Sequence, residues 1–414
     1  MLNRNAQMGV KVESVEGVEE ALAAADFRGV RTEMGMRYGV VDFDRGVIRP
    51  TLSPLPKVKS QVALMLNYMS EMGGGAAATP APWHTDLQAM GFVATALRRV
   101  PVNIGGATNI EDFEPGAIIT DGGSKSARFV DFSATHLIYE PLAGGDFADT
   151  DVVEEQKHSS GSITVTAGAA ADSGYAFHPL TETVSGGSPV LSPSVTGQYR
   201  LGGQIHGGAG GRANGRILLR QGETLRLAVE LQLLPIMAGV GYTPRTGDPL
   251  VVTGNPSGAP VKVSGIEYYL QAEGTQDRYV PILTECEIAL NNVLTPRKTF
   301  TNAAVGHSGA TAVRITDRKP STRIDPLHIL PNASPYQPDF IGRLLEGLNA
   351  ELVAKVGSLT GTHGKVIVWA PRTQPVGDFE PGDRDGETTA PLDVEFCGTD
   401  DGIDDELTIY HAFG

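Results

Sequence analysis

The clearest pattern in the sequence is an alternation of hydrophobic and polar positions that occurs twice. In the first copy five aliphatic residues fall on one face and polar residues fall on the other (Leu225, Leu227, Val229, Leu231, Leu233; Arg226, Glu230, Gln232). In the second copy the same alternation is shorter (Leu392, Val394, Phe396; Asp393, Glu395). A period of two predicts β-strands with one buried and one solvated face.

Similar signals precede both strands. Each follows a Gly-Glu-Thr triplet, at 222–224 and at 386–388, and each triplet follows an earlier apolar run that starts with glycine and a basic residue, at 215–220 and at 364–369. A glycine-containing turn between two such runs predicts a β-hairpin. Because the hairpin recurs, we interpret the chain as an internal duplication.

Further strands are predicted at residues 61–69, 136–139, 162–165, 175–177, 261–270, 285–290, 311–315 and 407–410. Hydrophobic spacing predicts one helix over Trp83–Leu97, weakened by Gly91, and another of about 16 residues opening at Pro338 and Asp339. The apolar stripe of the second helix comprises Phe340, Ile341, Leu344, Leu345, Leu348 and Leu352.

These elements predict an α+β fold that is mostly β. We expect a first unit at residues 1–245, with an insertion near 103–159, and a second unit at residues 246–414. One helix per unit cannot cover both faces of the strands, so the sheets are expected to stay open until neighbouring copies complete them.

Composition narrows the function. The chain of 414 residues has a formal charge of −15, which argues against a protein that grips nucleic acid through clustered Lys and Arg. Its two cysteines, Cys286 and Cys397, lie far apart and predict neither a disulfide framework nor a zinc site. No signal peptide and no membrane span are predicted.

No stretch predicts an active site. The glycine-dense segment Gly202–Gly215 lacks the Gly-Lys-Ser/Thr ending of a phosphate loop, so we assign its glycines to turns and close backbone approach. Gly306–Ala310 lacks the final glycine and the helix of a nucleophile elbow. The acidic run Asp400–Glu406 lacks the spacing of a calcium loop. The sequence therefore predicts no enzyme, no cofactor and no metal.

Several short segments, taken in order, carry a family resemblance. They are Lys11–Ser14, Val47–Leu52, Ala81–Trp83 with Leu87–Phe92, the glycine-rich approach to the first hairpin, Leu290–Val293 and Ile315–Pro320. Together they resemble a tail tube protein of long-tailed bacteriophages, in the larger, duplicated class. The resemblance covers most of the chain, although residues 103–159 are longer than the family leads us to expect and Trp83-His84 replaces small residues.

The resemblance implies a structural virion protein that forms stacked rings around a hollow tube, through which the phage DNA passes without specific binding. It implies two tandem β-sandwich or barrel units, trimeric rings with pseudo-sixfold symmetry, and contacts with other tail proteins such as the tape measure and terminator. Such a protein is made in the host cytoplasm and resides in the virion. The alternatives are another virion component, such as a baseplate or decoration protein, and a β-rich polysaccharide hydrolase.

Two sets of residues are assigned to the assembled tube. An acidic inner surface would repel DNA and let it slide, so we expect Glu230, Asp393 and Glu395 to face the lumen, with Arg226 as the exception. The proline-rich segment with Val47, Arg49, Pro54 and Lys57, together with the N-terminal arm, is expected to make contacts between rings.

Overall fold

The computed structural model describes the fold over most of the chain. The described residues are 6–29, 34–43, 58–158, 161–185, 188–201, 203–236, 245–246, 261–263, 266–272, 278–281, 283, 285–298, 310–325, 349–360, 363–377, 382–384, 387–389, 391–399 and 404–414. Strands dominate them, and a single α-helix, α1 (Pro82–Ala89), is present in this part of the chain. The predicted mostly-β, α+β class is confirmed.

The strands of the first half are β1 (Gln7–Val12), β2 (Phe27–Gly29), β3 (Gly35–Phe43), β4 (Val58–Glu71), β5 (Phe92–Pro101), β6 (Ile118–Thr120), β7 (Ser126–Phe132), β8 (His136–Ala143), β9 (Val152–Glu155), β10 (Ser162–Thr164), β11 (Ala171–Pro179), β12 (Thr183–Ser185), β13 (Ser188–Val190), β14 (Val195–Leu201), β15 (Gln204–Arg220), β16 (Arg226–Pro235) and β17 (Arg245–Thr246). Short 3₁₀ turns lie at Ala24–Asp26, Ile104–Gly106 and Ile110–Asp112.

The strands of the second half are β18 (Glu267–Ala272), β19 (Arg278–Tyr279), β20 (Glu285–Ala289), β21 (Val293–Lys298), β22 (Ala310–Asp317), β23 (Ser321–Ile324), β24 (Ala350–Gly357), β25 (Lys365–Val376), β26 (Gly382–Arg384), β27 (Glu387–Thr389), β28 (Leu392–Cys397) and β29 (Thr408–Ala412). Every predicted strand lies on or overlaps one of these elements or those of the first half.

Seven antiparallel pairings of the first half have counterparts in the second half, in the same chain order. The first set is β1–β2, β1–β14, β14–β15, β15–β16, β15–β17, β4–β16 and β3–β4. The second set is β18–β19, β18–β24, β24–β25, β25–β28, β25–β29, β23–β28 and β20–β23. The two predicted hairpins are β15–β16 and β25–β28.

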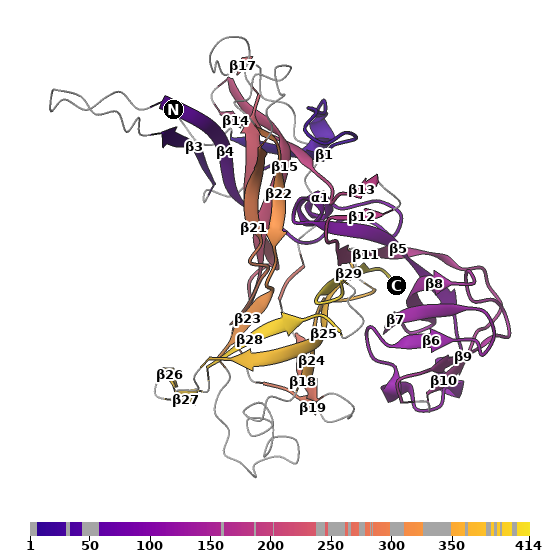
Figure 1. Cartoon of the computed structure of the whole chain (residues 1–414). Helices are drawn as coiled ribbons and strands as arrows, with labels where there is room; N and C mark the ends of the chain where they lie inside the picture. Colours follow the sequence, from indigo (N-terminus) through magenta and orange to yellow (C-terminus); the bar gives the residue numbers. More distant parts are fainter. Residues whose placement is uncertain are drawn as a thin grey trace, which may run out of the picture.

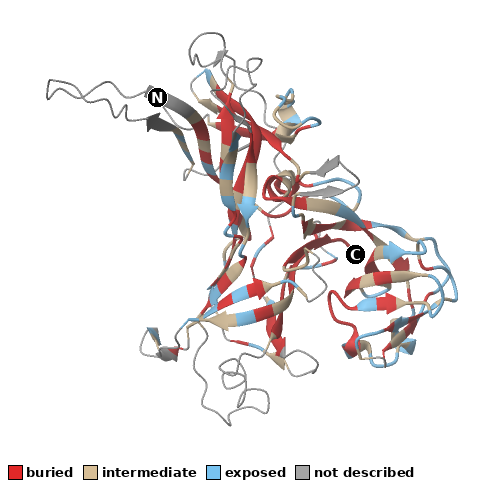
Figure 2. Ribbon diagram, viewed as in Figure 1, coloured by how far each residue is buried: buried red, intermediate tan, exposed pale blue. Residues whose placement is uncertain are grey.

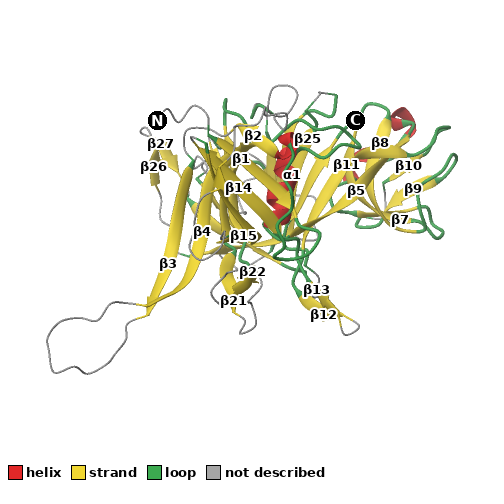
Figure 3. Ribbon diagram, turned by 90° about the horizontal axis from the view of Figure 1, so that it is seen from above, coloured by secondary structure: helices red, strands yellow, loops and turns green. Residues whose placement is uncertain are grey.

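A pairing between β15 and β20 joins the two halves into one continuous sheet. Its strand order is β3-β4-β16-β15-β20-β23-β28-β25. Figure 1 shows this sheet running from β3 and β4 past β15 to β28 and β25. Seen from above, β3 and β4 extend away from the rest of the molecule on the side opposite β6–β10 (Figure 3).

The alternation that defines the two hairpins matches the burial along their strands (Figure 2). Leu227, Leu231 and Leu233 of β16 are at most 1% exposed, and they pack in one core with Ile288 and Val394 from the second half. Burying each such side chain stabilises the fold by about 1.5–3 kcal/mol. A shared core therefore joins the two halves in addition to the β15–β20 pairing.

The glycine-dense segment lies in β15 and is not a loop. A Cβ atom at Gly211 would lie 2.3 Å from Leu233 Cδ2, and one at Gly208 would lie 2.6 Å from Leu233 Cβ. The glycines therefore allow close approach of neighbouring strands, as expected, and the segment cannot act as a phosphate loop because it is paired with β14 and β16.

Both helix predictions need correction. The first helix ends at Ala89, and residues from Phe92 onward form β5. Gly91 adopts φ +88° at the break, in the left-handed region that favours glycine and cannot continue a helix. The second predicted helix lies mostly outside the described residues, but Leu352 belongs to β24 and is paired with Leu270. Residues 350–357 are therefore strand and not the end of a helix.

The predicted insertion encloses a core of its own. Strands β6–β10 surround a separate cluster that includes Phe113, Ile119, Phe129 and Val153. This inserted module (residues 103–165) is flanked by β5 and β11, which pair with each other. The module contacts β24 and β25 of the second half through the ion pairs Lys157–Glu351 and Lys365–Asp131. It therefore packs against the second half and does not project freely.

Candidate functional site: a charged sheet face and an arm clamp

The three residues expected to face a lumen lie on one face of the continuous sheet, which we call the polar face. Matched rows of paired residues cross this face in the two halves: Gly35-Asn67-Glu230-Asn214 and Ala289-Ser321-Glu395-Gln374. Glu230 and Glu395 thus occupy corresponding positions. The Glu230 and Asp393 side chains are 54% and 57% exposed.

The polar face carries further arginines, which corrects the expectation of a single basic exception at Arg226. Arg216 lies 3.1 Å from Glu287 and 3.9 Å from Glu230. Further ion pairs are Arg220–Glu285 at 3.1 Å and Arg323–Asp393 at 3.9 Å. The Arg220–Glu285 and Arg323–Asp393 pairs line a groove of about 540 Å³ across β15, β20, β23 and β28. Several carboxylates of this face therefore lie beside guanidinium groups.

The sequence pattern missed these arginines for a physical reason. It identified which residues share a face within one strand, but not which strands lie side by side. Arg220 and Glu285 are far apart in the chain and become partners only through the β15–β20 pairing. The four residues assigned to contacts between rings, Val47, Arg49, Pro54 and Lys57, lie outside the described residues.

A second feature is an arm formed by β21 and β22, which pair only with each other among the described strands. The arm belongs to the second half but lies across β15 and β16 of the first half. Asn292 fastens its base by donating to the carbonyl oxygens of Met90 at 2.9 Å and Ala213 at 3.0 Å. Arg318 adds an ion pair with Glu406 at 3.0 Å.

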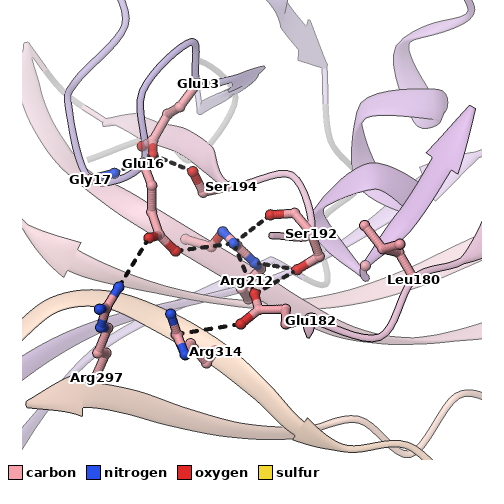
Figure 4. Close-up of polar contacts among 12 residues, drawn as sticks. Glu13, Glu16, Gly17, Leu180, Glu182, Ser192, Ser194, Arg212, Arg297 and Arg314 are labelled. Atoms are coloured by element: carbon pink, nitrogen blue, oxygen red, sulfur yellow. Dashed lines mark hydrogen bonds and ion pairs between the residues drawn. The ribbon is translucent and has the colours of Figure 1, made fainter. Parts of the chain in front are cut away.

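The arm is clamped by a chain of alternating charges around Arg212, a fully buried residue of β15 (Figure 4). The Arg212 guanidinium lies 3.3 Å from Glu16 and 3.4 Å from Glu182. On the arm, Arg297 reaches Glu16 at 3.6 Å and Arg314 reaches Glu182 at 3.4 Å. Three segments of the first half and both strands of the arm meet in this cluster.

Hydrogen bonds satisfy the rest of the Arg212 guanidinium. It donates to Ser192 Oγ at 3.0 Å, to the Ser192 carbonyl oxygen at 2.6 Å and to the Gly211 carbonyl oxygen at 3.2 Å. Burial lowers the pKa of Arg212, and Glu16 and Glu182 oppose that shift. The side chain remains charged because an arginine pKa lies far above neutrality. A lone arginine among glycines was the available sequence signal, and it was not recognised.

The inserted module is fixed to the second half by a buried ionic cluster. Lys157 lies 2.6 Å from Glu114 in the module and 2.5 Å from Glu351 on β24. Arg278 of β19 lies 3.2 Å from Glu114. Burial raises the pKa of Glu351 against the opposing effect of Lys157, whereas Glu114 has a lowered pKa because its cationic and amide partners outweigh its burial. The Trp369 indole donates to Glu351 at 2.5 Å.

A buried histidine pair links α1 to the C-terminal strand β29. The Ala81 N–H donates to His84 Nδ1 at 3.2 Å, so His84 Nε2 carries the hydrogen and donates to His411 Nδ1 at 2.9 Å. His411 Nε2 then donates to the His363 carbonyl oxygen at 3.0 Å. Burial lowers the pKa of His84 well below its ordinary value and that of His411 to about 4. Both rings are neutral at pH 7.

Catalytic and metal chemistry find little support in the described residues. No group of three or more His, Cys, Asp or Glu in this part of the chain is arranged to hold a metal ion. Burial raises the pKa of Cys286 to about 11, which makes it a weak nucleophile. Of the acidic run at 400–406, Asp404, Asp405 and Glu406 are engaged by Thr181, Thr399 and Arg318. No described helix is long and apolar enough to cross a bilayer.

A scan against protein-family models gives no match, and a search of curated proteins gives none either.

Proposed function

We propose that this protein is a structural subunit that assembles with copies of itself into stacked rings, forming the hollow tail tube through which a long-tailed bacteriophage ejects its DNA. The observation that carries the proposal is the recurrence of seven strand pairings around one continuous sheet. A repeated unit that pairs edge to edge with its own copy is suited to pairing with further copies.

The ends of the continuous sheet support ring formation. In the described part of the chain, β3 pairs only with β4, so its other edge has no strand partner. At the opposite end, residues 374–376 of β25 pair with β28 on one side only. Open edges of this kind are normally blocked or paired, because exposed edges lead to uncontrolled association. A closed ring pairs them.

The size of the sheet also suits a tube. Eight strands about 4.8 Å apart contribute roughly 38 Å of circumference per chain. Three chains would give twenty-four strands, a circumference of roughly 115 Å and a diameter near 37 Å between backbones. The arginines Arg216, Arg220 and Arg323 of the polar face each lie beside a carboxylate, so few cations are free to hold phosphates, which favours passage over binding.

Native mass spectrometry and negative-stain electron microscopy of the purified chain test the proposal. We expect oligomers of one defined size, and rings or tubes of uniform width. A baseplate or decoration protein would give single plates or small oligomers that never stack. A protein that stays monomeric at high concentration, with its sheet edges protected, would contradict the proposal.

A further inference from the structure

The internal junction between the two halves shows how one copy of the repeated unit meets the next. On one edge of β15, β14 pairs with residues 204–211 and β20 follows it at residues 216–220. The opposite edge of β15 is occupied by β16. The junction therefore uses the last residues of β15, beyond the end of β14.

Among the described strands, the second half presents the same edge without a strand partner. On β25, β24 occupies one edge up to Thr373, and β28 occupies the other edge from Arg372 to Val376. Residues Gln374 to Val376 thus extend beyond β24, as the end of β15 extends beyond β14. Strand β3 of the first half corresponds to β20 of the second half. β3 pairs with β4, and β20 pairs with β23, the counterpart of β4.

The matched rows of the polar face fix the register. Ala289 in the second half corresponds to Gly35 in the first half. Ala228 pairs with Arg216 in the first half, and Asp393 pairs with Val376 in the second half. Arg216 therefore corresponds to Val376. Across the internal junction Arg216 pairs with Ala289. The corresponding pair between two chains is Val376 with Gly35.

The backbone chemistry of the edge agrees with this register. At the internal junction the Leu290 N–H donates to the Gly215 carbonyl oxygen at 3.0 Å. The residue that corresponds to Gly215 is Pro375, which lacks an N–H but retains a carbonyl oxygen. Proline is tolerated at sheet edges. The residue that corresponds to Leu290 is Met36, whose N–H would donate to the Pro375 oxygen.

We propose that the partner of β25 is β3 of a second copy of this chain, paired antiparallel with Val376 opposite Gly35 and Gln374 opposite Arg37. This inference rests on the proposed ring assembly and names the strands and register that close it. The nine residues of β3 contain no proline and no lysine, two of the residues that commonly protect exposed edges.

Disulfide trapping tests the register. Because residues 215 and 290 share a hydrogen bond, the adjacent pair 216/289 is of the non-hydrogen-bonded kind, in which the Cα atoms are about 4.5 Å apart. In a Cys286→Ala, Cys397→Ser background, we expect Gly35→Cys with Val376→Cys to form intermolecular disulfides on mild oxidation. The products should run from dimers up to the number of chains in the ring measured by native mass spectrometry.

Two matched variants make the result decisive. Arg216→Cys with Ala289→Cys should form the same bond within one chain, which serves as the positive control for the template. Gly35→Cys with Glu395→Cys should not cross-link, since Glu395 lies one strand farther away on the same face. Rings that form without a Gly35–Val376 cross-link would overturn the strand assignment and leave the proposed function standing. Failure to form any ring would refute both.

Discussion

At the scale of single residues, the histidine pair between α1 and β29 makes stability depend on pH. The ordinary histidine pKa is near 6.5 in the unfolded chain and the pKa of His411 is about 4 in the folded chain. The folded state therefore favours the neutral ring. The contribution of neutral His411 to the free energy of unfolding is fully present above pH 6.5. It is lost as the pH falls toward 4, which lowers that free energy by roughly 3 kcal/mol.

Urea unfolding measured from pH 7 to pH 4 checks this prediction. We expect His411→Asn, which cannot titrate but retains an acceptor for His84, to show a smaller loss of stability over that interval than the unaltered chain. The matched control is His136→Asn, because His136 is only partly buried and should leave most of the pH dependence intact. Equal slopes for the unaltered chain and His411→Asn would show that the pair does not control acid stability.

At the scale of elements, the arm is held to the first half by charge. Arg212→Met would leave Glu16 and Glu182 without their buried partner, and breaking a buried ion pair typically costs about 3–5 kcal/mol. We expect a large drop in the midpoint of urea unfolding and faster amide hydrogen exchange in β21 and β22. Arg216→Met is the matched control, since its ion pairs are about half exposed and each contributes at most about 1 kcal/mol.

Comparing amide hydrogen exchange in the arm with that in the rest of the chain separates a local role of Arg212 from a general loss of stability. If Arg212→Met accelerated exchange in β6–β10 as much as in the arm, the clamp would be a global stabiliser and not a device that holds one element. If both arginine variants lowered stability equally, the buried charge chain would have no special role.

Individual strands and helices were predicted from sequence where the hydrophobic positions followed one clear period. The period of two in β16 and β28 identified both strands and their buried faces, because adjacent side chains of a strand must point to opposite sides. The helix beginning at Trp83 was predicted too long, because Leu87, Met90, Val93 and Ala94 also fit a helical stripe. Gly91 and the pairing of β5 with β11 decide otherwise.

Both predicted hairpins are present, but their first strands were aligned incorrectly with each other. The sequence comparison matched Gly215 with Gly364, whereas the pairing rows match Gly215 with Pro375. Gly364 instead precedes the start of β25, beside β29. Local similarity between short apolar runs cannot distinguish the two ends of a long strand, and only its cross-strand partners can.

At the scale of the whole molecule, the pairing of strands that are distant in sequence decides which charged side chains form ion pairs. The clusters at Arg212 and Lys157, and the ion pairs of the polar face, join residues that are distant in sequence. The sequence alone therefore predicted the fold class and three exposed acids, but it could not predict that Glu230 and Asp393 would lie beside arginines. The net charge of −15 describes the chain and not the face that the proposed tube presents to DNA.

The ion pairs on the polar face lead to a final prediction about DNA. Replacing Glu285, Glu287 and Asp393 by Gln, Gln and Asn would free Arg220 and Arg323 from their partners and leave Arg216 with only the longer contact to Glu230 at 3.9 Å. We expect this triple variant to bind double-stranded DNA at low salt, with an affinity that falls steeply as salt is added, because free arginines release counterions from phosphates. Fluorescence anisotropy of a labelled duplex measures both effects, and the unaltered chain should show no binding.

A second triple variant separates this local effect from the change in net charge. Glu111, Asp149 and Glu154 are exposed on the inserted module, and converting them to Gln, Asn and Gln removes the same three negative charges. Binding that depended only on net charge would be equal in the two variants. An arginine guanidinium that is already paired with a carboxylate is not available to a phosphate. We therefore expect DNA binding only when the carboxylates of the polar face are removed. Equal binding by both variants would mean that the ion pairs on the sheet do not control access to DNA.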